Sequence, residues 1–262
     1  GTIEHRIGEH VVPATHTTRE SLELNALLAS MVQERCKAAV MEVSSHALAM
    51  HRVESLTFRA GVFTNLTQDH LDYHGTMDEY FHAKKILFDH LNAEAVAVVN
   101  GDDASGLRLC EGTKARVITY GTGDGADVRA SGIALGVGGS RCTVTSGAAS
   151  MEVASSLTGR FNIANILAAC ATGVGLEIPL QTIATGIGNL SSVRGRFEQI
   201  VSPAGWTAVV DYAHTPDALE NCLRTIHDIL PAGRPHAIIT VFGCGGNRDK
   251  GKRPLMGRIA SA

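Results

Sequence analysis

The sequence lacks long apolar runs and blocks of like charge, and each absence excludes a class of protein. Its longest apolar stretches, residues 36–43 and 93–99, have the length of strands and fall short of the roughly 20 residues that a membrane helix needs. Lys and Arg number 23 against 26 Asp and Glu, with no run of five like charges. The basic surface typical of proteins that bind nucleic acid or anionic membranes is therefore missing, and we expect neither partner.

Cysteine pairs are also absent. The six cysteines stand singly, without a Cys-x-x-Cys motif, and the first residues do not form a charged-then-apolar leader. We therefore expect a cytoplasmic protein in a reducing environment. Hydrophobic residues make up 44% of the 262 residues and charged residues 19%, which is ordinary for one large or two smaller globular domains and argues against disorder, collagen or a coiled coil.

Helical and strand-like patterns alternate over the first 100 residues. Apolar residues recur at helical spacing over residues 21–35 and 78–91, whereas residues 38–43, 59–65 and 93–100 form strand-like apolar runs. The alternation predicts an α/β fold with a mostly parallel sheet.

The composition changes twice in the rest of the chain. Residues 115–158 consist of short segments rich in Gly, Ser, Thr and Val, which predict a small antiparallel appendage. Helices are expected over 162–174 and 179–187, and a second α/β unit over strand 207–211, helix 216–230 and strand 236–242. We therefore predict a first domain over residues 1–192 and a second over residues 193–262.

Polar side chains follow two of the predicted strands. Glu42, Ser44 and His46 lie at the end of one strand, and the loop of residues 64–75 follows the next with Asn65, Asp69, His70, Asp72 and His74. Because ligands bind at the carboxyl ends of strands in open α/β sheets, we expect both groups to line one cleft. Oxygen donors favour Mg²⁺ and imidazoles favour Zn²⁺, so the residues alone leave both metals open, as well as a polar loop without a metal.

Lys84 and Lys85 stand in the helix expected after that loop. A lysine pair usually lies on a solvated face, and a buried lysine near a cation would be repelled unless its charge were removed. Their position does not decide between these two cases.

Residues 243–254 form a glycine-rich loop with four cations after a predicted strand. Gly246, Gly251 and Lys252 have the spacing of a nucleotide phosphate loop, but Arg253 replaces the Ser or Thr that would bind Mg²⁺. We reject a phosphate loop here. The arginine side chains instead favour a site for a carboxylate or phosphate, which arginine can bind through two parallel hydrogen bonds.

Two weaker signals lie in helix-opening turns. Asn162 and Asn165 are three residues apart and could face a purine, or could equally be a helix cap and an internal amide. Asp211 ends a predicted strand, where it could bind a ribose hydroxyl or cap the next helix.

Taken in order, these motifs resemble the Mur ligase family. The resemblance rests on residues 42–46, the 64–75 loop, Gly159-Arg160-Phe161-Asn162, Gly195-Arg196-Phe197-Glu198, residues 211–216 and the 243–254 loop, and so covers essentially the whole chain. Residues 69–75 and 243–254 are most similar to the members that add the third amino acid to UDP-MurNAc-L-Ala-D-Glu.

The resemblance implies a P-loop-type central ATPase domain followed by part of a Rossmann-like domain. It also implies an ATP-dependent ligase that forms an amide through an acyl phosphate. Its partners would be UDP-MurNAc-dipeptide, ATP and a diamino acid, and we expect the protein to be a monomer. The Arg248 loop favours meso-diaminopimelate over lysine. The family's N-terminal domain and phosphate loop are missing from these residues, so we expect the chain as written to be inactive or nearly so.

The resemblance also implies a role for individual residues. Glu42, His70 and Lys84 would hold Mg²⁺, Lys84 as a carbamate formed with CO₂, and Asn65 would lie near the transferred phosphate. The nucleotide would contact Asn162, Arg196, Asp211 and His214, and the UDP-linked substrate would contact Thr17, Thr18, Ser44 and Arg52. Arg248 would bind a carboxylate of the incoming amino acid.

The sequence departs from the family pattern at Arg19, Met50 and Asn247, where some members carry Gly, Gln and Asp. Two other functions stay open, the first suggested by the histidines and the second only by the missing phosphate loop. One is a metal-dependent hydrolase with Zn²⁺ on His46, His70, Asp72 and His74; the other is a non-catalytic nucleotide-binding module.

Overall fold

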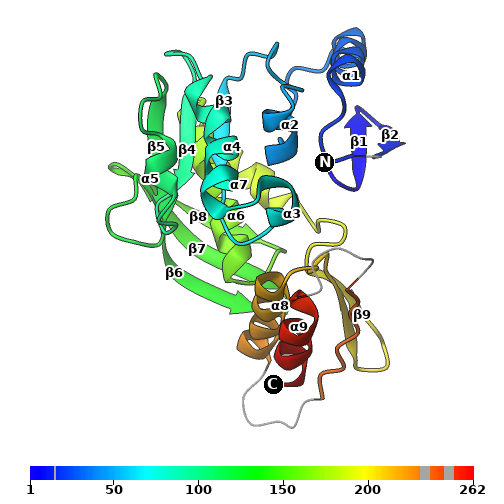
Figure 1. Cartoon of the computed structure of the whole chain (residues 1–262). Helices are drawn as coiled ribbons and strands as arrows, with labels where there is room; N and C mark the ends of the chain where they lie inside the picture. Colours follow the sequence, from blue (N-terminus) through cyan, green and yellow to red (C-terminus); the bar gives the residue numbers. More distant parts are fainter. Residues whose placement is uncertain (15, 231–236, 245–250) are drawn as a thin grey trace.

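A six-stranded sheet forms the centre of the molecule (Figure 1). In this computed structural model, which describes residues 1–14, 16–230, 237–244 and 251–262, the sheet strands lie side by side in chain order. They are β3 (Ala60–Phe63), β4 (Val96–Asn100), β5 (Arg116–Gly121), β6 (Val128–Gly136), β7 (Gly139–Ser146) and β8 (Ala149–Ser155). Strands β3 to β6 pair in parallel, and β6 to β8 pair antiparallel. The predicted α/β fold with an antiparallel appendage is thus confirmed.

Helices cover both faces of the sheet, and alternate residues of β4 show why. Val96 and Val98 pack into a core with α6 (Arg160–Gly175) and α7 (Leu180–Gly188). Ala97 and Val99 point to the opposite face, where α4 (Met77–Asp89) and α5 (Gly106–Leu109) supply the second core. A strand buried on both faces is apolar throughout, which explains the continuous apolar run in its sequence.

The N-terminal elements pack beside this sheet. They are the hairpin of β1 (Glu4–Ile7) and β2 (His10–Pro13), then α1 (Ser21–Gln33) and α2 (Ser45–Ala49). Leu24 of α1 and Leu48 of α2 join Val53 in a third apolar cluster. Helix α3 (Leu71–His74) is a single turn that precedes α4.

The strand predicted over residues 38–43 is wrong. Residues 38–43 form no strand, none of the described strands pairs with their backbone, and Val40 is 95% exposed. An apolar composition does not supply the neighbouring backbone that makes an extended segment a strand. The end of the segment is instead fixed by Thr18, which bonds to the backbone of Glu42 and Ser44.

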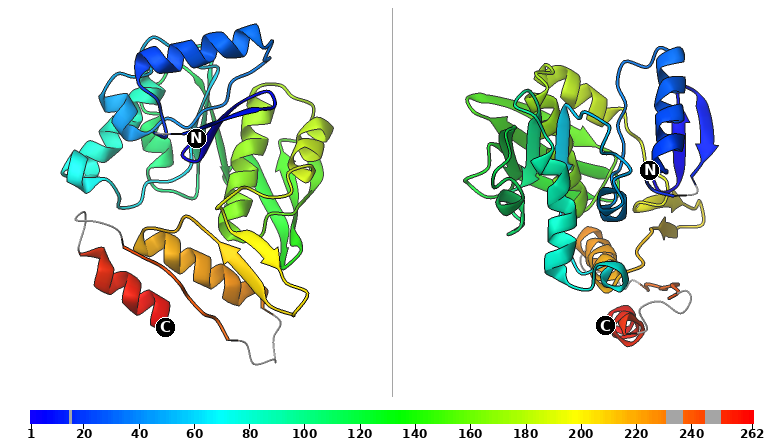
Figure 2. Two further views of the ribbon diagram at one scale, coloured as in Figure 1. Left: turned by 90° about the vertical axis from the view of Figure 1, so that its right-hand side faces the viewer. Right: turned by 45° about the horizontal axis from the view of Figure 1, so that its top comes forward.

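The C-terminal elements lie at one end of the sheet, with the short hairpin beside two helices (Figure 2). They are β9 (Glu198–Val201), β10 (Thr207–Val210), α8 (Pro216–Ile229) and α9 (Lys252–Ser261). β10 pairs antiparallel with β9 rather than joining a parallel sheet.

The strand predicted over residues 236–242 is also wrong where the structure describes it. Residues 237–242 form no strand, and Ile239 and Val241 are 88% and 91% exposed. As with residues 38–43, the segment lacks a neighbouring strand to pair with among the described residues.

None of the described helices has both the length and the apolarity needed to cross a bilayer.

Candidate active site

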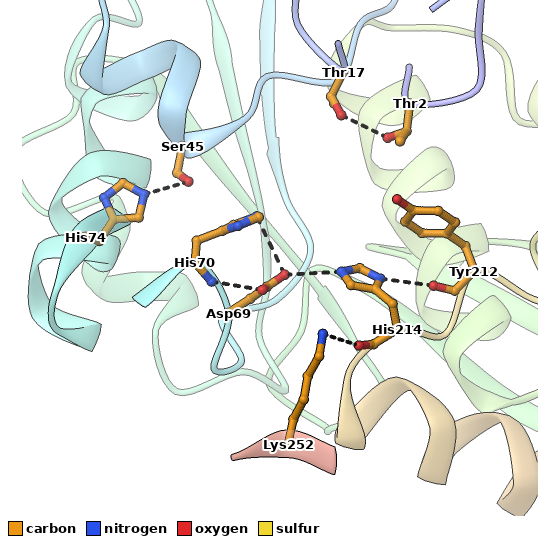
Figure 3. Close-up of polar contacts among 9 residues, drawn as sticks. All are labelled: Thr2, Thr17, Ser45, Asp69, His70, His74, Tyr212, His214 and Lys252. Atoms are coloured by element: carbon orange, nitrogen blue, oxygen red, sulfur yellow. Dashed lines mark hydrogen bonds and ion pairs between the residues drawn. The ribbon is translucent and has the colours of Figure 1, made fainter. Parts of the chain in front are cut away.

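The residues predicted to bind the UDP-linked substrate come together around Thr18. Its buried hydroxyl donates to the carbonyl of Glu42 at 2.9 Å and accepts from the amide of Ser44 at 3.0 Å. Arg52 donates from Nη1 to the Thr18 carbonyl at 3.1 Å, and Thr17 bonds to Thr2 at 3.1 Å through the hydroxyl groups (Figure 3). Thr17, Thr18, Ser44 and Arg52 therefore form one neighbourhood, which also contains the backbone of Glu42.

Lys84 differs sharply from its neighbour Lys85. Both lysines are partly buried, but Lys85 pairs with Asp89 and donates to the Glu111 carbonyl. Lys84 is half-buried, its Nζ lies 4.8 Å from the centre of the Tyr80 ring, and no hydrogen bond to Nζ is found among the described residues.

Burial and nearby charges shift the pKa of Lys84 in opposite directions. Burial lowers the pKa of its ammonium group, and the negative charges of Glu42, Asp69 and Asp103 offset this only in part. Three carboxylates from three separate segments therefore act on one desolvated amine. Asp69 and Asp103 follow the adjacent strands β3 and β4, as expected where the carboxyl ends of parallel strands meet.

Asp69 holds His70 in an unusual backbone conformation. His70 has φ 56°, in the left-handed region, at the N-terminal end of α3. For a residue with a Cβ this conformation costs on the order of 1 kcal/mol. Asp69 Oδ1 accepts the His70 amide at 2.8 Å, and Asp69 Oδ2 lies 3.6 Å from His70 Nε2 (Figure 3). The carboxylate thus fixes both the backbone and the ring of His70.

The three histidines considered for zinc contact one another through their rings. The ring of His46 lies 4.8 Å from that of His70 and 5.4 Å from that of His74, and His74 stacks on Tyr80 at 5.2 Å. Burial, followed by the positive charge of His70, lowers the pKa of His46 and of His74. His74 Nε2 bonds to Ser45 Oγ at 2.9 Å.

These contacts do not assemble a zinc site. In the described residues, no three His, Cys, Asp or Glu side chains are placed to hold one metal ion. The zinc set of His46, His70, Asp72 and His74 is therefore not brought together as ligands. The set of Glu42, His70 and Lys84 would acquire its third donor only through a modified lysine, and it stays a prediction.

The loop that carries Asn65 is held by the end of β4. Asn100 Nδ2 donates to the Thr64 carbonyl at 2.8 Å, and Asp103 Oδ2 accepts the Leu66 amide at 3.0 Å. Asn65 lies between these two anchored residues with an exposed side chain.

Two of the predicted nucleotide residues make internal bonds. The buried Asn162 donates to the Thr158 carbonyl and accepts from Asn165, which corresponds to the internal amide considered above. Asp211 accepts the Phe197 amide at 2.7 Å, and burial raises the pKa of its carboxyl, with that amide and Arg196 opposing the shift.

The remaining predicted residues lie on the C-terminal side. The Arg196 guanidinium lies 5.5 Å from the centre of the Tyr212 ring. His214 Nδ1 bonds to the Tyr212 carbonyl at 3.0 Å, and its Nε2 lies 3.8 Å from Asp69 Oδ2 (Figure 3). Arg248 lies outside the described residues.

Sequence reasoning missed Asp103 and Tyr80. Asp103 follows β4 closely, so the argument that singled out the other two strand ends could have found it. Tyr80 touches Lys84, His70 and His74, and burial raises the pKa of its hydroxyl to about 12. Its position within an apolar helical pattern gave no signal beyond a place in the core.

Two family models match the chain. A model of the Mur ligase middle domain matches residues 1–173, and a model of the Mur ligase glutamate ligase domain matches residues 195–262.

Curated relatives match nearly the whole chain. It is 50% identical to the UDP-N-acetylmuramoyl-L-alanyl-D-glutamate--2,6-diaminopimelate ligase of Geobacter sulfurreducens, over 99% of this chain and 52% of that protein. The protein of the same name from Phocaeicola vulgatus is 45% identical, over 99% of this chain and 52% of its own length. The chain thus spans about half the length of the curated relatives it matches.

Solved structures of Mur ligases share the fold of this chain. A structure of a UDP-N-acetylmuramoyl-L-alanyl-D-glutamate--2,6-diaminopimelate ligase superposes with a TM-score of 0.74 at 33% identity, covering 96% of this chain and 52% of that one. MurF from Acinetobacter baumannii shares the fold, with a TM-score of 0.68 at 22% identity over 79% of this chain and 48% of its own.

Proposed function

The chain belongs to the Mur ligase family, and from that premise we propose that it carries part of the active site of an ATP-dependent ligase. The reaction proposed is the joining of 2,6-diaminopimelate to UDP-MurNAc-L-Ala-D-Glu, in the synthesis of a peptidoglycan precursor. Support comes from the names of the relatives at 45–50% identity. The Arg248 loop favours the same amino acid over lysine.

The observation that carries the proposal is the desolvated Lys84 amine among the charges of Glu42, Asp69 and Asp103. A lowered amine pKa increases the neutral fraction, and only a neutral amine can add CO₂. The adduct would replace the ammonium by a carbamate and so leave the surrounding carboxylates without their cation. Glu42, His70 and a carbamate on Lys84 form a donor set rich in oxygen, which fits Mg²⁺.

Bound there, Mg²⁺ would neutralise charge on the transferred phosphoryl group. The residues of this chain would supply positioning, which is most of what phosphoryl transfer asks of a protein. Thr17, Thr18, Ser44 and Arg52 would bind the UDP-linked dipeptide. Its terminal carboxylate would attack the γ-phosphate of ATP near Asn65, and the incoming amine would then displace phosphate from the acyl phosphate.

The nucleotide would lie between the two matched parts of the chain. Arg196 would bind its phosphates, Asp211 its ribose, and Asn162 and His214 would complete the site. Asp211 and Asn162 already make bonds within the chain, so we expect nucleotide binding to exchange some of these for bonds to ATP.

Mass spectrometry of the gently handled protein in bicarbonate near neutral pH tests the central residue. Lys84→Ala and Lys85→Ala form a matched pair of neighbouring residues. The unaltered protein and Lys85→Ala should gain the mass of one CO₂, and Lys84→Ala should not. An adduct of equal abundance in Lys84→Ala would contradict the assignment.

Amide formation tests the reaction itself. Because we expect residues 1–262 alone to be inactive or nearly so, the assay uses a full-length Mur ligase that contains them. It is supplied with UDP-MurNAc-L-Ala-D-Glu, ATP and Mg²⁺, and with either diaminopimelate or L-lysine. Product formed with diaminopimelate, lost in Lys84→Ala and kept in Lys85→Ala, supports the proposal. ATP hydrolysis that needs neither the dipeptide nor the amino acid would refute it.

A further inference from the structure

Asp69 touches two parts of the molecule that are far apart in the sequence. Its carboxylate binds the amide and faces the ring of His70 in the loop after β3, and its Oδ2 lies 3.8 Å from His214 Nε2, just before α8 (Figure 3). The C-terminal part, residues 195–262, thus contacts the loop that sets the position of His70.

The geometry of His214 makes this contact directional. Its Nδ1 bonds to the Tyr212 carbonyl, and a carbonyl oxygen can only accept, so Nδ1 carries a hydrogen. Nε2 is then the ring atom left to face Asp69. The backbone of His214 is held as well, since Lys252 of α9 donates from Nζ to the His214 carbonyl at 2.8 Å. One bond therefore holds the His214 ring and the other holds its backbone, and together they fix the direction in which Nε2 faces Asp69.

We propose that Asp69 is a positioning residue that couples the seating of the C-terminal part to the conformation of His70. When His214 lies against Asp69, the carboxylate is held where it also accepts the His70 amide and keeps the left-handed turn that opens α3. The role of His70 as a metal ligand rests on the proposed function, whereas the coupling between the two parts rests on these contacts alone.

A second ion pair between the same two parts provides a matched control. Arg160 Nε lies 3.9 Å from Asp228 Oδ2, at the start of α6 and in α8. This pair joins the C-terminal part to the helix that covers the sheet, at a place remote in sequence from the 64–75 loop. Arg160→Gln therefore removes an ion pair between the same two parts of the chain without removing a contact to Asp69 or His70.

The experiment combines amide hydrogen exchange of residues 66–76 with binding of Mn²⁺ alone, followed by its electron spin resonance signal. His214→Ala, Asp69→Asn and the double variant are compared with Arg160→Gln, at temperatures where circular dichroism shows all of them folded. The Asp69→Asn variant would keep an oxygen for the His70 amide but lose the negative charge that pairs with the His214 ring when that ring is protonated. Loss of a partly exposed pair should change exchange and Mn²⁺ affinity by roughly two- to fivefold.

Faster exchange of the loop in both single variants, with the double variant no faster than either, supports the coupling. A parallel loss of Mn²⁺ affinity supports the positioning role, because a general loss of stability would not change the affinity of the folded protein. Unchanged loop exchange in His214→Ala, or an equal increase in Arg160→Gln, overturns the proposal. Faster loop exchange in a protein that binds no Mn²⁺ supports the coupling and refutes the metal role given to His70.

Discussion

Replacing Thr18 by Val tests whether one buried hydroxyl organises the predicted substrate neighbourhood. Valine keeps the branched shape of threonine and replaces the hydroxyl by a methyl group. This hydroxyl donates to the Glu42 carbonyl and accepts from the Ser44 amide. Because Thr18 is 2% exposed, water cannot replace either bond without a rearrangement. The neighbouring Thr17→Val is the control, since the Thr17 hydroxyl bonds to that of Thr2 and is partly exposed.

The size of the effect follows from the number of bonds lost. Each hydrogen bond contributes about 1 kcal/mol net, and the variant loses two part-buried bonds, so Thr18→Val should lower the free energy of unfolding by about 2 kcal/mol. In a protein of this size that corresponds to a fall in Tm of roughly 4–8 °C. Thr17→Val should change the free energy of unfolding by about 0.5 kcal/mol or less.

Thermal and urea unfolding followed by circular dichroism measure both variants. A local effect is also expected, because the lost bonds hold residues 42 and 44 in place. Amide exchange over residues 40–45 should therefore increase more in Thr18→Val than in Thr17→Val. Equal stability of the two variants would refute the conclusion that Thr18 holds this segment in place.

Two further substitutions probe the charge of Lys84 and a tight turn of the sheet. Because the pKa of Lys84 is lowered in the folded protein, the unfolded chain binds more protons between this pKa and the ordinary lysine value, so stability relative to Lys84→Met should rise with pH across that window. Urea unfolding from pH 7 to 10 measures the difference, with Lys85→Met as control. A difference that stays flat or falls with pH would contradict the burial of Lys84. Gly139→Ala should lower the free energy of unfolding in urea by at least about 3 kcal/mol, because the φ of Gly139 is +125° and a Cβ would collide with the Ser155 carbonyl oxygen. A Cβ at Gly138 meets no atom within 4 Å, so Gly138→Ala should lower it by less than about 1 kcal/mol. Equal effects would show that the backbone can move aside.

The sequence predicted those elements whose formation depends on their own residues. Strand β4 and helix α4 were found because an apolar run and a helical apolar spacing are local signals. The segments 38–43 and 237–242 carry the same apolar signal, yet Val40 and Val241 are exposed. A strand also requires a neighbouring backbone, which is a property of the tertiary structure and is not written in the segment itself.

The residues of the candidate site also fall into those that the sequence located and those that needed the structure. The strand-end argument located Glu42 and the His70 loop, and the spacing of the two lysines gave no means to choose between them. The resemblance to the Mur ligases pointed to Lys84, and the structure adds a physical difference, because the Lys84 amine lies over the Tyr80 ring whereas Lys85 pairs with Asp89. Adjacent helical residues point in directions about 100° apart, so the orientation of the helix on the sheet decides which one faces the site.

The change from parallel to antiparallel pairing within the sheet has a consequence for how the chain folds. Strands β6, β7 and β8 are joined by tight turns, with Gly136 opposite Gly139 and Ser146 opposite Ala149, so their pairing closes only short loops. Pairing of β3 with β4 instead brings together Phe63 and Val99 across the intervening helices. Local pairing is entropically cheaper and faster, so β6–β8 should form the folding nucleus to which α6 and the earlier strands add. During synthesis β3 and β4 leave the ribosome before that nucleus exists. We therefore expect the apolar faces of these strands to stay exposed to other chains until residues 128–155 have emerged.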